Sequence, residues 1–90
     1  MPNKSDNIDL IRKSKTHRKI VQFFLENQGS IDTPRGIATW TNENLQNVRI
    51  ALEDLVKNGI LKAHRTSSTI GYSCAITEKK LSQIYSCIKK

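Results

Sequence analysis

The first clear hydrophobic pattern along the chain is a helical one in residues 20–25. Its apolar positions follow the i, i+3, i+4 rule, with two neighbours widening the stripe: Ile20, Phe23, Phe24, Val21 and Leu25. Gly29 stands where a glycine often closes a helix, so we expect this helix to end there. Upstream, a few apolar residues indicate a short amphipathic piece within a basic N-terminal segment, residues 1–14: Ile8, Leu10 and Ile11.

A shorter second helix is expected to follow. Asp32 or Thr33 can cap it, and Pro34 suits its first position because the N–H that proline lacks would be unpaired there. Its apolar residues are Ile37, Ala38 and Trp40, and we expect Trp40 in the core or at an interface. Thr41 and Asn42 then break the pattern, and either residue can cap the next helix.

The third helix has the clearest pattern and is predicted to span residues 42–58. Its apolar side chains fall within about 100° of one another on a helical wheel, and they are Leu45, Val48, Leu52, Leu55 and Val56. Gly59 ends the helix. The opposite side is mostly polar: Glu43, Gln46, Asn47, Arg49, Ile50, Glu53 and Lys57.

A β-hairpin and a last helix complete the pattern. Strands are predicted at 60–65 and 70–76 around a polar turn at 66–69, with alternate residues of the second strand facing inward: Ile70, Tyr72, Cys74 and Ile76. We therefore expect Cys74 to be buried. Thr77 can cap a C-terminal helix within residues 77–90, whose apolar face is Leu81, Ile84, Tyr85 and Ile88. Cys87 lies beside that face, where it can meet a second subunit.

The charge adds a first indication of function. Lys and Arg total 15 against 8 Asp and Glu, a net charge of +7 in 90 residues, which favours a polyanionic partner. No apolar run reaches membrane-spanning length and no signal-peptide pattern occurs, so we expect a cytoplasmic protein without a membrane partner. His17 and His64 do not stand at zinc spacing from the cysteines, and no phosphate loop or nucleophile motif occurs. We expect no metal, no cofactor, no small-molecule ligand and no enzymatic activity.

The central stretch resembles the winged helix-turn-helix family of transcriptional regulators. The resemblance rests on a small residue in the second helix, an apolar residue and two leucines on the third, and a glycine that leads into the wing: Ala38, Val48, Leu52, Leu55 and Gly59-Ile60-Leu61. It implies a mainly α fold with a small β-hairpin, namely a three-helix core plus wing in residues 15–76, with the C-terminal helix available for dimerisation. Three features depart from the pattern: a turn without glycine, a wing turn without Lys or Arg, and an exposed Ile50.

Within this architecture, the third helix is the expected reader of duplex DNA. Amides pair well with adenine and Arg with guanine in the major groove, so the candidate base contacts are Asn44, Gln46, Asn47 and Arg49. Ile50 can meet thymine methyl groups or a protein partner. Phosphate contacts are expected from the starts of the second and third helices, namely Thr33, Arg35, Thr41 and Asn42. Further phosphate contacts are expected from the basic run at residues 12–19, namely Lys15, His17 and Arg18, and from the wing, namely Arg65, Ser67 and Ser68. The alternative is that these faces are simply solvated.

The resulting hypothesis is a homodimer that binds specific double-stranded DNA sequences and regulates transcription. A winged-helix module that binds another protein and not DNA is the main alternative, because Ile50 and the uncharged wing turn fit it. An RNA-binding winged helix is a third possibility.

Overall fold

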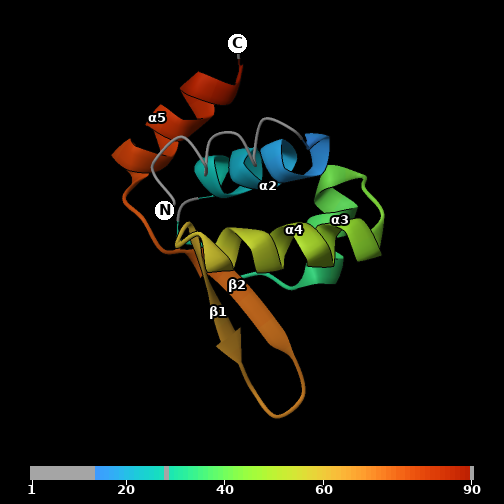
Figure 1. Cartoon of the computed structure of the whole chain (residues 1–90). Helices are drawn as coiled ribbons and strands as arrows, with labels where there is room; N and C mark the ends of the chain where they lie inside the picture. The colour runs from blue at the N-terminus through green and yellow to red at the C-terminus, as the bar shows by residue number, and fades with distance from the viewer. Residues whose placement is uncertain (1–13, 28, 90) are drawn as a thin grey trace.

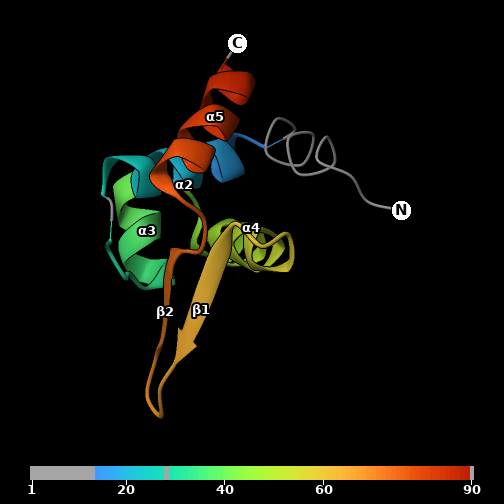
Figure 2. The ribbon, with the colours of Figure 1, turned by 90° about the vertical axis from the view of Figure 1, so that its left-hand side faces the viewer.

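The computed structural model describes residues 14–27 and 29–89. Its elements are, in order, α2 (Lys15–Glu26), α3 (Pro34–Thr41), α4 (Leu45–Lys57), β1 (Leu61–Arg65), β2 (Ile70–Cys74) and α5 (Glu78–Lys89). Figure 1 shows α2, α3 and α4 grouped together, with the hairpin projecting away from them on the side opposite α5. The view turned by 90° in Figure 2 shows the same arrangement. The order of helices and hairpin confirms the fold predicted from the sequence. The amphipathic piece predicted around Ile8, Leu10 and Ile11 lies outside the described residues.

The ends of α2 and α3 are set by side-chain caps. The hydroxyl of Ser14 accepts a hydrogen bond from the backbone N–H of His17 at 3.2 Å and begins α2. That helix ends at Glu26 with Asn27 as its C-cap, earlier than the predicted end at Gly29. At α3 the prediction is confirmed, because Thr33 is the N-cap and Pro34 occupies the first turn.

The start of α4 differs from the prediction of a helix over residues 42–58. Asn42 is the C-cap of α3 and adopts the left-handed conformation, with φ of +57°, so the chain turns there without a glycine. The N-cap of α4 is Asn44, whose side-chain oxygen accepts from the N–H groups of Gln46 and Asn47 at 2.8 and 3.3 Å. The predicted start was therefore wrong by three residues. The end agrees, since Lys57 is the last helical residue and Gly59 has φ of +76°.

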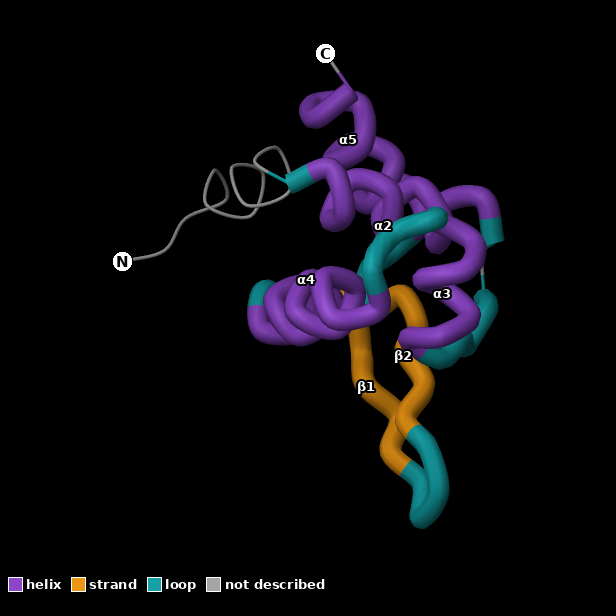
Figure 3. Tube along the Cα trace, turned by 90° about the vertical axis from the view of Figure 1, so that its right-hand side faces the viewer, coloured by secondary structure: helices purple, strands orange, loops and turns teal. Residues whose placement is uncertain are grey.

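The hairpin is joined to the segment that precedes α3. The antiparallel register of β1 and β2 runs from Leu61 opposite Cys74 to Arg65 opposite Ile70, so β2 ends two residues before the predicted position 76. Figure 3 shows the two strands and the loop that closes them. The backbones of Asp32 and Tyr72 exchange two hydrogen bonds, of 3.0 and 2.8 Å. This isolated bridge ties the segment before α3 to β2.

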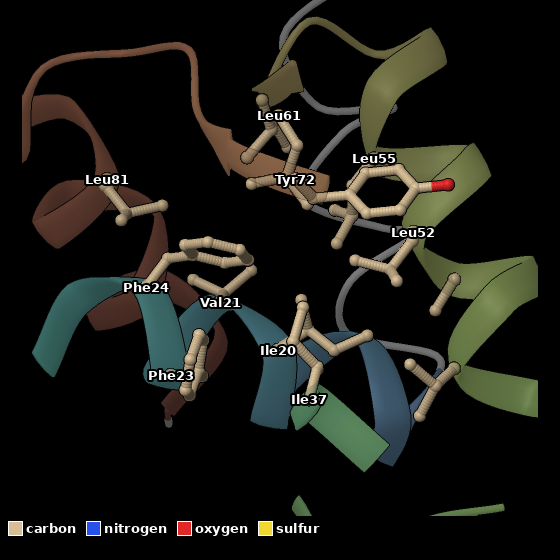
Figure 4. Close-up of a cluster of buried hydrophobic side chains, with 13 residues drawn as sticks. Ile20, Val21, Phe23, Phe24, Ile37, Leu52, Leu55, Leu61, Tyr72 and Leu81 are labelled. Atoms are coloured by element: carbon tan, nitrogen blue, oxygen red, sulfur yellow. The ribbon is translucent and has the colours of Figure 1, made fainter. Parts of the chain in front are cut away.

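The hydrophobic core lies between the helices and the base of the hairpin (Figure 4). Its side chains come from all six elements and include Phe24, Ile37, Leu52, Leu55, Leu61, Tyr72 and Leu81, each at most 3% exposed. On α4 the buried residues are Val48, Ala51, Leu52 and Leu55. Leu45 and Val56, predicted to be buried, are half-buried at the edges, and Ala51 was missed.

The C-terminal part covers one side of the core. The Thr77 hydroxyl accepts from the N–H of Lys80 at 3.1 Å, which confirms the predicted cap of α5. This helix packs on α2 and buries Leu81 completely. Cys74 is half-buried, contrary to the prediction of a buried cysteine, because β2 ends there and its thiol turns to the backbone oxygen of Ile76 at 3.2 Å. The side chain of Cys87 lies outside the part that the structure describes.

Candidate nucleic-acid interface

A cleft of about 640 Å³ lies between the start of α3, the exposed side of α4 and the hairpin. It unites five of the predicted site residues: Thr33, Arg35, Arg49, Arg65 and Ser68. Its remaining lining is Pro34, Glu53, Thr66, Thr69, Ile70 and Tyr72. The sequence therefore predicted several residues of this cleft separately, and the fold brings them together.

Positive charge dominates the cleft. Arg35, Arg49 and Arg65 are exposed and come from α3, α4 and β1, and none of them forms an ion pair with a carboxylate of the described residues. Each guanidinium therefore remains available to a ligand, and its planar set of donors matches the oxygens of a phosphate group. A polyanion that passes through this cleft would meet three cationic groups on different walls.

One carboxylate also lies in the cleft, and it faces a tyrosine. Burial raises the pKa of the Tyr72 phenol above its usual value, and the neighbouring Glu53 carboxylate, which can accept the phenolic proton in a hydrogen bond, raises it further. The phenol is protonated at neutral pH and can donate this hydrogen bond to Glu53. Sequence analysis placed Glu53 on the polar side of α4 and Tyr72 in the hairpin, without linking them.

The outer face of α4 continues from the cleft. With 3.6 residues per turn, the buried residues of α4 stand about 180° from the stripe of Gln46, Ile50, Glu53 and Lys57. Arg49 flanks this stripe on the side of the cleft, and Asn47 flanks it on the other side. Gln46, Asn47 and Arg49 are all exposed, as predicted. Asn44 is exposed too, but its side-chain oxygen caps the helix, so only its NH₂ group faces outward unpaired.

The turn before α4 does not present the residues that were expected there. Thr41 is 3% exposed, and its hydroxyl donates to the backbone oxygen of Ile37 at 2.8 Å, so its side chain offers nothing to a phosphate. Asn42 is exposed but closes α3, and it does not stand at a helix start. His17, also expected at a phosphate, is 7% exposed, and its Nε2 lies 3.2 Å from an Asp54 carboxylate oxygen. It joins α2 to α4 inside the protein.

A network that sequence analysis missed fastens this turn to α2. The Lys19 ammonium donates to a Glu43 carboxylate oxygen at 2.9 Å and to the backbone oxygen of Thr41 at 3.0 Å. The Thr16 hydroxyl donates to the other Glu43 oxygen at 3.0 Å. The hydrogen bond from Lys19, followed by that from Thr16, holds the pKa of Glu43 below its usual value. Glu43 thereby fixes the segment immediately before the N-cap of α4.

The remaining candidates lie outside the cleft lining. Lys15 and Arg18 are exposed on α2, and Ser67 is exposed at the tip of the hairpin. Among residues 14–27 and 29–89, no group of three or more His, Cys, Asp or Glu side chains is placed to hold a metal ion. No helix in these same ranges is long and apolar enough to cross a bilayer.

Comparisons with known proteins give a structural neighbour and no sequence relative. No protein-family model and no curated protein matches the chain. Among solved structures, the chain is similar to a homodimeric winged helix-turn-helix DNA-binding domain from Mycobacterium bovis, described as a possible ArsR-family transcriptional regulator. The two chains are 18% identical with a TM-score of 0.63, over 99% of this chain and 83% of the other. With its helix order, hairpin and cleft, the chain adopts the winged helix-turn-helix fold.

Proposed function

We propose that the protein is a homodimeric, sequence-specific binder of double-stranded DNA that acts as a transcriptional regulator. In this proposal α4 enters the major groove with Gln46, Asn47 and Arg49 facing the base edges. The start of α3 and the hairpin lie against the sugar-phosphate backbone on one side. The observation that carries the proposal is the convergence of Arg35, Arg49 and Arg65 on one cleft beside the polar face of α4.

The chemistry of the two surfaces matches the two parts of a DNA duplex. Three guanidinium groups on separate walls suit the phosphates, which supply affinity but no sequence information. The amides of Gln46 and Asn47 can each donate to and accept from adenine, and amide or guanidinium pairs of this kind discriminate between bases. Both surfaces meet at Arg49, which lines the cleft and stands beside Gln46 on α4. A protein with this arrangement can bind any DNA duplex through the phosphates and bind certain base sequences more tightly.

The homodimer is proposed because the similar solved domain is described as homodimeric. Here α5 packs on α2, on the side away from the hairpin (Figure 1). A second copy joined at these helices would leave both clefts open. A two-fold dimer of this kind should prefer half-sites about 10 base pairs apart, or a multiple of that. Sedimentation velocity tests the dimer, and a monomer persisting at high micromolar concentration contradicts it.

Selection from a randomised duplex library, followed by fluorescence anisotropy on the recovered sequence, tests the function. We expect a specific sequence that binds more tightly than a scrambled duplex, and more tightly than structured RNA of the same sequence. Arg49→Ala should weaken binding. Lys80→Ala removes an exposed cation outside the cleft and should leave binding unchanged in protein that sediments as the wild type does. If no duplex binds at low salt, the proposal is wrong.

A protein-binding module is the second candidate, favoured by the hairpin loop, where residues 66–69 are exposed and uncharged. Salt distinguishes the two candidates. Binding that releases counterions from phosphates weakens steeply as salt rises, whereas docking through apolar contacts does not. Tight, salt-insensitive binding to a protein, without duplex binding, would establish this candidate.

A further inference from the structure

Ile50 is an apolar side chain at an unusual place on α4. Three large hydrophobic residues are exposed in the described part of the chain, namely Ile31 at 61%, Ile50 at 54% and Trp40 at 43%. The ring of Trp40 packs edge-on against Phe23 with centroids 5.1 Å apart, and Ile31 lies against Gly71. Both therefore cover other parts of the protein. Ile50 instead belongs to the stripe of α4 that faces away from the core.

The surroundings of Ile50 are polar and cationic. It lines a shallow hollow on α4 together with Asn44, Leu45, Gln46 and Arg49. Gln46 precedes it by four residues, which places the two side chains on the same face and about 6 Å apart along the helix axis. Leu45 is half-buried, so Ile50 is the one exposed aliphatic side chain of this hollow, and it stands beside an amide that can pair with a base. A protein interface would need a larger apolar centre than this one side chain provides.

In the major groove, one apolar group is available to such a side chain. Unmodified DNA carries a methyl group on a base edge only in thymine, at C5. We propose that Ile50 reads a thymine by packing against this methyl group, one or two base pairs from the base that Gln46 contacts. The spacing follows because 6 Å along the helix covers about two base-pair steps of 3.4 Å. This inference rests on the proposed DNA-binding function and assigns Ile50 a role in specificity.

The test removes the methyl group from the DNA and the side chain from the protein. The probe is the duplex selected by the wild-type protein, in which each thymine in turn is replaced by deoxyuridine, and affinity is measured by fluorescence anisotropy. Deoxyuridine lacks only the C5 methyl. The wild type should lose about fourfold in affinity at one or two positions, the equivalent of about 0.8 kcal/mol for one buried carbon. Ile50→Ala should no longer respond to deoxyuridine at those positions.

Ile31→Ala is the matched control, because Ile31 is an isoleucine outside α4 that is at least as exposed as Ile50. It should keep the wild-type response to deoxyuridine. Ile50→Ala should retain the wild-type dependence on salt, since it removes no charge. If the wild type ignores every deoxyuridine, or if Ile50→Ala responds as the wild type does, the inference is overturned while DNA binding stands. Absence of any duplex binding at low salt overturns both.

Discussion

Removal of the three cleft arginines should change how DNA affinity depends on salt. Each phosphate contact contributes about 0.9 to the slope of log K against log salt concentration. Arg35, Arg49 and Arg65 line one cleft and form no ion pair with described carboxylates. On a non-specific duplex Arg49 has no matching base edge to pair with, so each of the three is counted as one phosphate contact. Their combined share of the slope is about 2.7. A fourfold rise in salt concentration should therefore lower the DNA affinity of the wild type by a factor about fortyfold larger than that of the triple alanine variant.

Fluorescence anisotropy on a non-specific duplex, across a series of salt concentrations, measures this slope directly. Single variants should each reduce it by about 0.9 and the triple variant by about 2.7, because each arginine is counted as one phosphate contact. Lys80→Ala removes an exposed cation of α5 outside the cleft and should leave the slope unchanged in protein that sediments as the wild type does. If the triple variant has the wild-type slope, the cleft does not contact phosphates. If Lys80→Ala reduces the slope as much as Arg49→Ala, the effect reflects net charge and not the cleft.

Three further predictions concern stability. Leu52→Ala removes a fully buried side chain of α4 and should lower the free energy of unfolding by about 2–5 kcal/mol, measured by urea denaturation with an unchanged m-value. Gly59→Ala places a Cβ at φ of +76° and should cost about 1–2 kcal/mol in the same assay, and no loss would contradict the backbone geometry at the end of α4. The folded state lowers the pKa of Glu43 below its usual 4.5. The ionised carboxylate therefore stabilises the fold at pH values above 4.5, and this stabilisation is lost as the pH falls through the pKa of the folded state. Glu43→Gln should therefore be less stable than the wild type at neutral pH, and the difference should shrink on acidification, as thermal melts at several pH values can show.

The sequence predicted what depends on local spacing and missed what depends on distant partners. Val48, Leu52 and Leu55 recur at helical intervals, so their burial follows from the pattern alone. The burial of His17 does not, because its partner Asp54 lies 37 residues further along the chain. His17 was therefore predicted as a phosphate contact, because it stands within a basic run of the sequence. Ala51 was missed because an alanine fits both exposed and buried positions, and only the packing of α4 decides between them.

The start of α4 and the shape of the cleft likewise depend on more than local spacing in the sequence. Thr41, Asn42 and Asn44 are all good N-cap residues, and the left-handed backbone of Asn42 places the cap at Asn44. The arginines of the cleft were each predicted as phosphate or base contacts, because exposed cations at helix starts and wings are recognisable from sequence. Their arrangement around one cleft was not, since it depends on how the hairpin sits against α3. Sequence reasoning thus predicted the three arginines of the cleft, but neither the place of Glu53 and Tyr72 in it nor its shape.

The pair of hydrogen bonds between the backbones of Asp32 and Tyr72 bears on the entropy of association. They join the hairpin to the residue that immediately precedes the cap of α3, so two walls of the cleft are held together before any ligand arrives. Fixing a free backbone costs about 1–2 kcal/mol per residue, whereas ordering a long side chain costs about 0.5–1.5 kcal/mol. A ligand in this cleft therefore has to order arginine side chains but not the hairpin backbone. A larger part of the free energy of each contact then contributes to affinity.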